Sequence, residues 1–118
     1  MKNINKNEAL MELLSLLKKT AIENDAPVWK RIATDLEAPT KQRRIVNLYK
    51  LDKYCKDGET IVVPGKVLGM GEVTKKLQVA AYTFSEDAHK KINASGKAMT
   101  IRELIAKNPK GDKVRIMG

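Results

Sequence analysis

The chain has 118 residues, 42% of them hydrophobic, and its 23 lysines and arginines outnumber its 14 aspartates and glutamates, which gives a net charge of +9. A chain of this length predicts one globular domain, and its charge surplus favours nucleic acid as the partner ahead of an anionic membrane. The sequence has no apolar run of about eighteen residues, which excludes a membrane-spanning helix, and its 4% aromatic content disfavours a base-stacking platform for single strands.

Residues 5–37 are predicted to form two helices. Apolar side chains recur at helical spacing, as Leu10, Leu13, Leu14, Leu17 and Ala21 in the first helix and as Val28, Trp29, Ile32 and Leu36 in the second. We expect Asn5 to cap the first helix and Asp25 the second, with Pro27 in its first turn, where a missing N–H is tolerated. A helix lying on a membrane is the alternative for the first stripe, but the mixture of charges on its polar side favours packing against the chain's own domain.

Residues 38–44, with the sequence APTKQRR, are predicted to form a basic loop. The segment has no apolar periodicity and places Lys41, Arg43 and Arg44 close together. An ordinary charged linker is one interpretation. We favour a loop that contacts phosphates and becomes ordered on RNA, because two adjacent guanidinium groups can each bind phosphate in a two-pronged geometry.

Residues 45–118 are predicted to form a mixed α/β core. The expected elements are a strand at Ile45–Leu51, a helical turn at Asp52–Lys56, strands around Ile61–Val63 and Leu77–Phe84, helices at Ser85–Gly96 and Ile101–Lys107, a turn at 108–111 and a strand at Val114–Ile116. Caps support both helices. Ser85 precedes the first, and Thr100 with Glu103 can form a capping box for the second.

The segment Thr60–Ser85 carries the glycines that we expect to matter most. Its middle is predicted to be a turn in which Gly69 and Gly71 permit either a positive φ angle or the close approach of another backbone. Lysines accompany these glycines, namely Lys66, Lys75 and Lys76. On such a turn they would face outward, where a polyanion could meet them.

Two other lysines have an expected structural role. Lys90 and Lys91 follow Glu86 and Asp87 by four residues on the predicted helix, in the favourable orientation for ion pairs. They also lie near the negative end of that helix. We therefore do not expect them to be RNA ligands.

Motifs for catalysis and for cofactors are incomplete. His89 and Cys55 supply only two of the four ligands of a structural zinc site, and no nucleophile has a reason to lie beside His89. A phosphate-binding loop would need Ser or Thr where Val67 stands and glycine where Thr60 stands, and Thr74 replaces the third glycine of a dinucleotide motif. We expect no enzyme activity, no cofactor, no metal and no small-molecule substrate. The lone cysteine and the lack of a signal-like start favour the cytoplasm.

Two stretches of the chain resemble a known family. VNLYKLDKYCKDGETIVVPGKVLGMGEVTKKLQVAAYTFSEDAHKKI and MTIRELIAKNPKGDKVRI are similar to the large-subunit ribosomal protein eighteen-e of archaea and eukaryotes, a relative of bacterial large-subunit protein fifteen. The most specific parts are Val63–Gly69, Phe84 and Ser85 with Ala88, and Asn108–Gly111 with Val114 and Arg115. The similarity covers nearly the whole chain, and its short length is typical of the archaeal form.

The resemblance implies a structural constituent of the large ribosomal subunit, in the cytoplasm, with ribosomal RNA and neighbouring ribosomal proteins as partners. It also implies an α/β fold, an irregular superhelix of β-β-α turns preceded by an N-terminal pair of helices. RNA would be bound by shape and backbone contacts of a basic surface. The predicted RNA-binding residues are Lys41, Arg43, Arg44, Lys66, Gly69, Gly71, Lys75, Lys76, Lys110 and Arg115. A free-standing DNA- or tRNA-binding module is the alternative.

Overall fold

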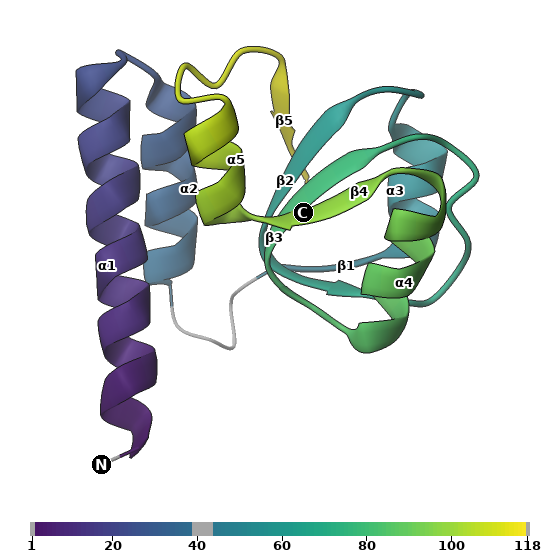
Figure 1. Ribbon diagram of the computed structural model, residues 1–118, viewed down its shortest axis with the longest axis horizontal. Helices are drawn as coiled ribbons and strands as arrows, with labels where there is room; N and C mark the ends of the chain where they lie inside the picture. Colours follow the sequence, from purple (N-terminus) through teal and green to yellow (C-terminus); the bar gives the residue numbers. More distant parts are fainter. Residues whose placement is uncertain (1, 39–43, 118) are drawn as a thin grey trace.

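The computed structural model describes residues 2–38 and 44–117, with side chains from Glu8 onwards. Its helices are α1 (Lys2–Glu23), α2 (Pro27–Glu37), α3 (Leu48–Tyr54), α4 (Glu86–Ser95) and α5 (Ile101–Lys107). Its strands are β1 (Arg44–Asn47), β2 (Thr60–Leu68), β3 (Gln78–Phe84), β4 (Lys97–Thr100) and β5 (Val114–Ile116). The described part of the chain is thus α/β with an N-terminal pair of helices, as predicted (Figure 1).

The five strands form one parallel sheet in the order β1-β2-β3-β4, with β5 also paired to β2. The first residues of β2, Thr60–Val62, pair with β5, and its last residues, Gly65–Leu68, pair with β1. The strands β5 and β1 therefore follow one another along the same edge of β2. This arrangement makes the sheet irregular and brings the chain's C-terminal strand beside its central one.

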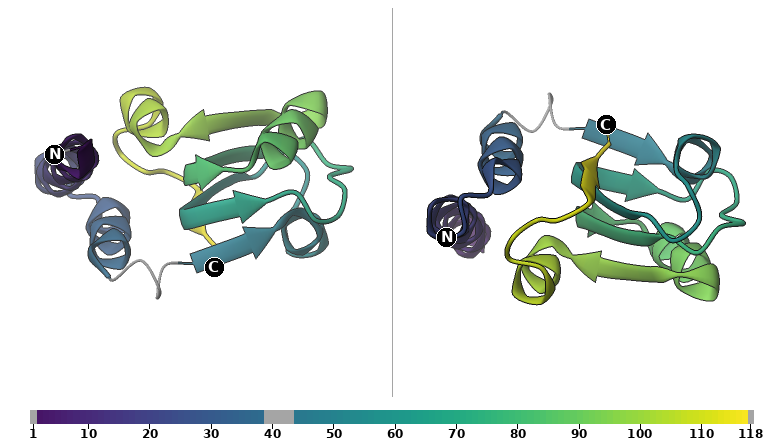
Figure 2. Two further views of the ribbon diagram at one scale, coloured as in Figure 1. Left: turned by 90° about the horizontal axis from the view of Figure 1, so that it is seen from below. Right: turned by 90° about the horizontal axis from the view of Figure 1, so that it is seen from above.

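Helices cover both faces of the sheet, as parallel sheets require. Alternate residues of β2 belong to different clusters, since Ile61 and Val63 pack with α3 and α4, whereas Val62 packs with α1, α2 and α5. In Figure 2, α1 and α2 are seen nearly end-on at one side of the sheet, and α3 and α4 lie at the opposite side. Both clusters consist mainly of buried aliphatic side chains, with Cys55 in the first and Trp29 in the second.

The two N-terminal helices pack side by side against the sheet. Leu13 and Leu17 of the predicted apolar stripe are buried in the α1–α2–α5 cluster, which confirms that the helix packs on its own domain. Trp29 is fully buried, and its Nε1 donates a hydrogen bond to the Pro109 carbonyl at 2.7 Å. No helix in residues 2–38 or 44–117 is long and apolar enough to cross a membrane.

The predicted caps of these helices are wrong, apart from Pro27. Helix α1 already begins at Lys2, before Asn5. Asp25 does not cap α2: it has a φ of 48° and lies in the turn that ends α1, while Ala26 takes the capping position and Pro27 the first turn. Because Asp25 belongs to the left-handed turn that ends α1, Ala26 is the one residue left between that turn and Pro27.

The predicted strand at 45–51 is too long. The strand ends at Asn47, and Leu48 and Leu51, three residues apart, are both fully buried on α3. Strand β2 in turn runs through Pro64 and Gly65, where its register with β3 shifts. Because β2 and β3 are parallel, the segment between them is a crossover and not a tight turn.

The C-terminal half follows the prediction more closely. Ser85 Oγ accepts a hydrogen bond from the Ala88 N–H at 3.2 Å and caps α4. Thr100 and Glu103 form the predicted capping box of α5, and β5 lies at Val114–Ile116. Strand β4, Lys97–Thr100, is an addition to the predicted elements, because only four residues were left between the two predicted helices, Ser85–Gly96 and Ile101–Lys107.

Candidate nucleic-acid interface

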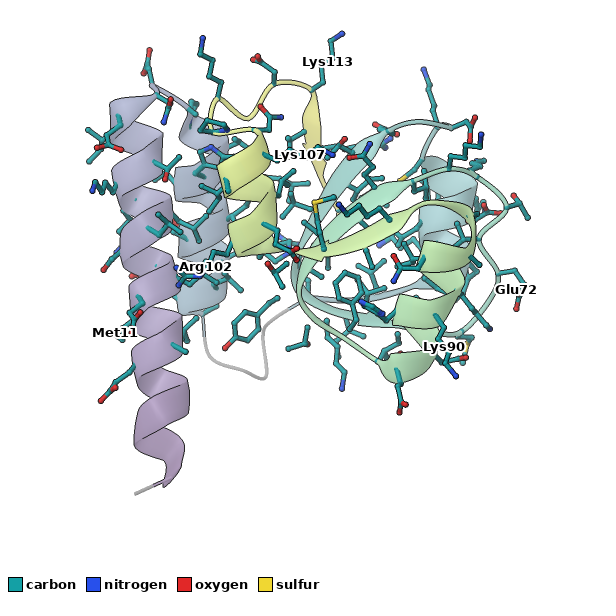
Figure 3. The ribbon with its side chains drawn as sticks, viewed as in Figure 1. Met11, Glu72, Lys90, Arg102, Lys107 and Lys113 are labelled. Atoms are coloured by element: carbon teal, nitrogen blue, oxygen red, sulfur yellow. The ribbon has the colours of Figure 1, made fainter. Side chains whose placement is uncertain are left out.

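Exposed lysines gather where the strands of the sheet begin. In register, Thr60 of β2 lies opposite Gln78 of β3 and Val114 of β5, and Gln78 lies opposite Lys97 of β4. Six exposed lysines, which lie on this row or on the segments that lead into it, form what we call the lysine rim: Lys56, Lys76, Lys97, Lys107, Lys110 and Lys113. The view of Figure 3 places Lys107 and Lys113 toward the top of the molecule, near the start of β5.

Backbone hydrogen bonds hold the rim together. Gly58 N–H donates to the Lys76 carbonyl at 2.8 Å, and Lys97 N–H donates to the Leu77 carbonyl at 2.9 Å. The Lys107 ammonium donates to Gln78 Oε1 at 3.2 Å. The lysines therefore stand on segments of fixed relative position, although they come from four different connections of the fold.

The acidic side chains of this region mostly accept hydrogen bonds from backbone N–H groups. The Asp57 carboxylate accepts a hydrogen bond from the Lys76 N–H at 2.6 Å, and the Glu59 carboxylate accepts one from the Lys56 N–H at 2.8 Å. Within the described residues, the ammonium groups of Lys56 and Lys76 have no ion-pair partner. Positive charge consequently faces solvent, while the nearby negative charge is partly neutralised by main-chain dipoles.

An open hollow of about 840 Å³ lies beside the rim. Its lining comes from two segments, 56–60 and 112–115. Arg115, a predicted RNA ligand, lies there and donates to the Tyr54 carbonyl at 2.9 Å and to the Glu59 carboxylate at 3.4 Å. Arg115 is thus partly engaged within the protein, and Lys113 is the more available cation.

Lys75 has a structural contact that the sequence interpretation missed. Its ammonium donates to the carbonyls of Asp52 and Cys55 at the end of α3, the latter at 2.7 Å. A cation at the carboxyl end of a helix interacts favourably with the unpaired carbonyls there. The neighbouring Lys76, in contrast, is exposed.

The two glycines of the crossover pack against the protein itself. A Cβ on Gly69 would lie 2.7 Å from Asp87 Oδ2, and one on Gly71, whose φ is +100°, would lie 2.7 Å from Tyr49. The carbonyls of both glycines accept hydrogen bonds from the Lys91 ammonium, at 3.1 and 3.0 Å. Internal packing therefore explains both glycines, and an RNA contact at either one stays a prediction.

Of the remaining predicted residues, the structure describes Arg44 on β1 and Lys66 on β2. Lys41 and Arg43 fall outside the described residues. Arg44 is the first residue of β1 and not part of a loop, and its Nε lies 3.9 Å from the Asp35 carboxylate. Lys66 is exposed on β2. The eight predicted residues that the structure describes are thus spread over the start of β1, the end of β2, the crossover and the rim, and the structure brings Lys76 and Arg115 to the start of β2.

A second cationic region lies outside the predicted set. Two adjoining hollows, of about 720 and 240 Å³, share Tyr82 and Thr100 in their lining, and Lys90 and Arg102 line one each. Figure 3 shows Lys90 on α4 and Arg102 on α5. The predicted pair between Glu86 and Lys90 is absent among the described residues, whereas Lys91 pairs with Asp87 at 3.5 Å. The expected ion pair is therefore no reason to leave Lys90 out of the RNA ligands.

Besides Lys76 and Lys110, which were predicted, three more rim lysines could have been found from the sequence. Lys107, Lys110 and Lys113 recur every third residue around the 108–111 turn, and Lys97 follows the glycine that ends α4. Their spacing gives no sign that four connections converge, because that follows only from the register of the sheet. His89, as predicted, is an exposed side chain. The described residues contain no group of three or more side chains suited to a metal ion.

Comparison with known proteins gives a consistent result. Residues 26–100 match the model of a family described as the ribosomal proteins 50S-L15, 50S-L18e and the 60S protein twenty-seven-A. The chain is 48% identical over 112 residues to the large ribosomal subunit protein eL18 of Methanoregula boonei, covering 94% of this chain and 93% of that protein. It is 47% identical to the same protein of Archaeoglobus fulgidus, covering 94% and 96%, and 47% identical to that of Methanopyrus kandleri, covering 94% and 92%.

Proposed function

The chain belongs to the family of ribosomal proteins 50S-L15, 50S-L18e and the 60S protein twenty-seven-A, and we propose that it is a structural protein of the large ribosomal subunit that binds ribosomal RNA through its basic surface. Its relatives are ribosomal structural proteins and not enzymes, in agreement with the prediction from sequence. The chain would act in the cytoplasm, with ribosomal RNA and neighbouring ribosomal proteins as partners.

The lysine rim is the observation that carries the RNA-binding part of this proposal. Ammonium groups are point charges that neutralise phosphates without demanding a particular base. The deep major groove of A-form RNA is hard for side chains to read, so a protein that joins RNA helices works mainly through backbone and shape. Rigidly placed lysines on a sheet edge, with few aromatic side chains, suit this mode of binding.

Among the residues predicted from sequence, we assign the main phosphate contacts to Lys76, Lys110 and Lys66. Lys56, Lys97, Lys107 and Lys113 join them from the rim. Lys41 and Arg43 remain proposed contacts on the segment that precedes β1. Arg44, Lys75 and Arg115 have partners within the protein, and we give them a supporting role.

Co-sedimentation tests the proposal directly. A tagged copy of the chain, expressed in an archaeal host, should sediment with large ribosomal subunits and stay with them after a wash in moderate salt. A free-standing DNA- or tRNA-binding module, the alternative function, would remain in the light fractions or leave the subunits at low salt. Recovery of the chain only in those fractions would exclude the ribosomal assignment.

A further inference from the structure

Two residues with exposed hydrophobic side chains, Met70 in the crossover between β2 and β3 and Tyr49 on α3, have adjacent backbones. Met70 is 67% exposed and Tyr49 is 56% exposed. The Tyr49 N–H donates to the Met70 carbonyl at 3.1 Å, and Gly71 packs on the Tyr49 backbone. We call this pair, Met70 with Tyr49, the apolar prong.

Hydrogen bonds and close packing constrain the backbone that carries the apolar prong. The carbonyls of three consecutive residues, Gly69, Met70 and Gly71, each accept a hydrogen bond from a neighbouring element. Two of these bonds come from one ammonium, that of Lys91, and the space around both glycines is filled by protein atoms. Because the backbone of this segment is already constrained, a partner that covers the Met70 side chain would cause little further loss of backbone entropy.

Two carboxylates lie beside the prong, although the chain carries a net charge of +9. Lys91 lies 3.0 Å from the Glu72 carboxylate and 3.5 Å from that of Asp87. The side chains of Glu72 and Asp87 are 75% and 66% exposed, whereas that of Lys91 is 28% exposed. Two carboxylates therefore face solvent beside the prong, and their shared cation is mostly covered. Lys53, further along α3, holds its ammonium 5.4 Å from the Tyr54 ring.

We propose that the apolar prong docks a basic protein segment in the large subunit, and that this contact is not made by RNA. Phosphates would be repelled by the exposed carboxylates of Glu72 and Asp87. A lysine or arginine could instead lay its aliphatic stem on Met70 and its charge near Glu72, or place its cation over the Tyr49 ring. The proposal rests on the ribosomal function proposed above and names a surface for one of the protein neighbours.

The contrast between two edges of the molecule supports this division. In Figure 3, Glu72 lies at the far right of the molecule, whereas Lys107 and Lys113 lie toward the top. One edge thus offers lysines to phosphates, and another offers an apolar pair with carboxylates. Such a protein could contact RNA and a second protein at the same time.

Photo-cross-linking tests the proposal in assembled subunits. The chain with Met70→p-benzoylphenylalanine, incorporated into large subunits and irradiated, should give an adduct with a protein that survives ribonuclease. The same reagent at Lys113, on the lysine rim, should give an adduct with RNA. Predominant RNA adducts from position 70, or no adduct at all, would overturn the proposal.

A position of equal exposure controls for random capture. Met11 on α1 is 65% exposed, and Figure 3 shows it on the opposite side of the molecule from Glu72. Its p-benzoylphenylalanine variant should not give the protein adduct seen from position 70. Capture of the same partner with the same yield from both positions would also contradict a specific site.

Charge reversal tests the role of the carboxylate. Glu72→Lys should lower the yield of the protein adduct from position 70 several-fold, and Glu72→Gln should lower it less. Co-sedimentation of the wild-type chain and of each variant is measured first. Absence of the wild-type chain from the subunits would refute the ribosomal function, whereas loss of the adduct from a variant that still co-sediments concerns the docking site alone. An unchanged yield in the Glu72→Lys subunits would show that charge does not select the partner.

Discussion

At the scale of single residues, Gly58 and Gly71 illustrate two different reasons why a position requires glycine. Both have a positive φ, 84° for Gly58 and 100° for Gly71. A Cβ on Gly58 would meet nothing within 4 Å, whereas a Cβ on Gly71 would lie 2.7 Å from both the Cβ and the backbone nitrogen of Tyr49. Only Gly71 therefore adds a steric requirement to the conformational one.

We predict different losses of stability for the two alanine variants. Gly58→Ala should lower the free energy of unfolding by about 1 kcal/mol, the usual penalty for a left-handed alanine. Gly71→Ala should lower it by at least about 2 kcal/mol, because the Tyr49 backbone must also move. Urea unfolding of the free protein measures both. Equal losses would mean that the crossover can shift away from α3 without strain.

Asp52 links the crossover to α3 in a way that depends on pH. Its Oδ1 accepts hydrogen bonds from the Thr74 N–H and from the Thr74 hydroxyl, both at 2.9 Å. The bond from the Thr74 backbone is the main cause that lowers the pKa of Asp52 below its ordinary value of 3.8, and the Thr74 hydroxyl and the charge of Lys75 act in the same direction. These contacts favour the ionised carboxylate in the folded state.

The contribution of the ionised Asp52 carboxylate to the free energy of unfolding should therefore disappear at acid pH. Because the folded pKa lies below the unfolded one, the stabilisation is fully present above pH 3.8 and is lost as the pH falls through the folded value. Asp52→Asn should be less stable than the wild-type protein near pH 6, and the difference should shrink below pH 3.8 in urea unfolding. Asp112→Asn, which changes an exposed carboxylate, should show no such convergence. A constant difference across the pH range would contradict the assigned role.

At the scale of elements, prediction from sequence succeeded where the signal was local. The capping box of Thr100 and Glu103, the Ser85 cap and the Pro27 position depend on residues a few positions apart, and each lies where it was predicted. The same is true of the buried face of α1, whose leucines recur at helical spacing.

The predictions from sequence that were wrong or incomplete concern contacts between residues far apart in the chain. The chain leaves β1 after Asn47 because Leu48 and Leu51 can both be buried on one face of a helix, and a run of apolar and polar residues does not decide between that helix and a strand. The role of Lys75 depends on α3 ending beside the crossover, with the accepting carbonyls 23 and 20 positions earlier in the chain. The lysine rim, likewise, depends on strand register.

Lys75 and Lys76 should accordingly behave in opposite ways. Lys75→Met removes the ammonium from the carbonyls at the end of α3 and should lower the free energy of unfolding by about 1–2 kcal/mol, with little change in the salt dependence of RNA binding. Lys76→Met should leave stability within about 0.5 kcal/mol of the wild-type value and should make that salt dependence shallower. Urea unfolding and RNA titration of both variants check this. If Lys75→Met weakened RNA binding and left stability unchanged, Lys75 would be an RNA ligand, as the sequence predicts.

At the scale of the whole molecule, the described residues form a flattened body with extents of 36 × 35 × 21 Å. Figure 1 looks down its shortest axis, so the top of that view, where Lys107 and Lys113 lie in the matching view of Figure 3, is an edge of the body. Under the proposed function, this thin edge with its lysines would enter the space between RNA helices and neutralise phosphates on both sides. The net charge of +9 alone does not specify this edge; the parallel sheet does, by aligning the starts of its strands.

The salt dependence of binding to large-subunit ribosomal RNA tests this account most directly. Each phosphate neutralised adds about 0.7 to 0.9 to the slope of log K against log salt. The double variant Lys76→Gln with Lys113→Gln should therefore have a slope shallower by about 1.4 to 1.8 than the wild-type protein. Lys19→Gln with Lys30→Gln, which removes the same charge from exposed positions of α1 and α2, should leave the slope nearly unchanged. Equal slopes for the two double variants would show that binding depends on net charge and not on the lysine rim.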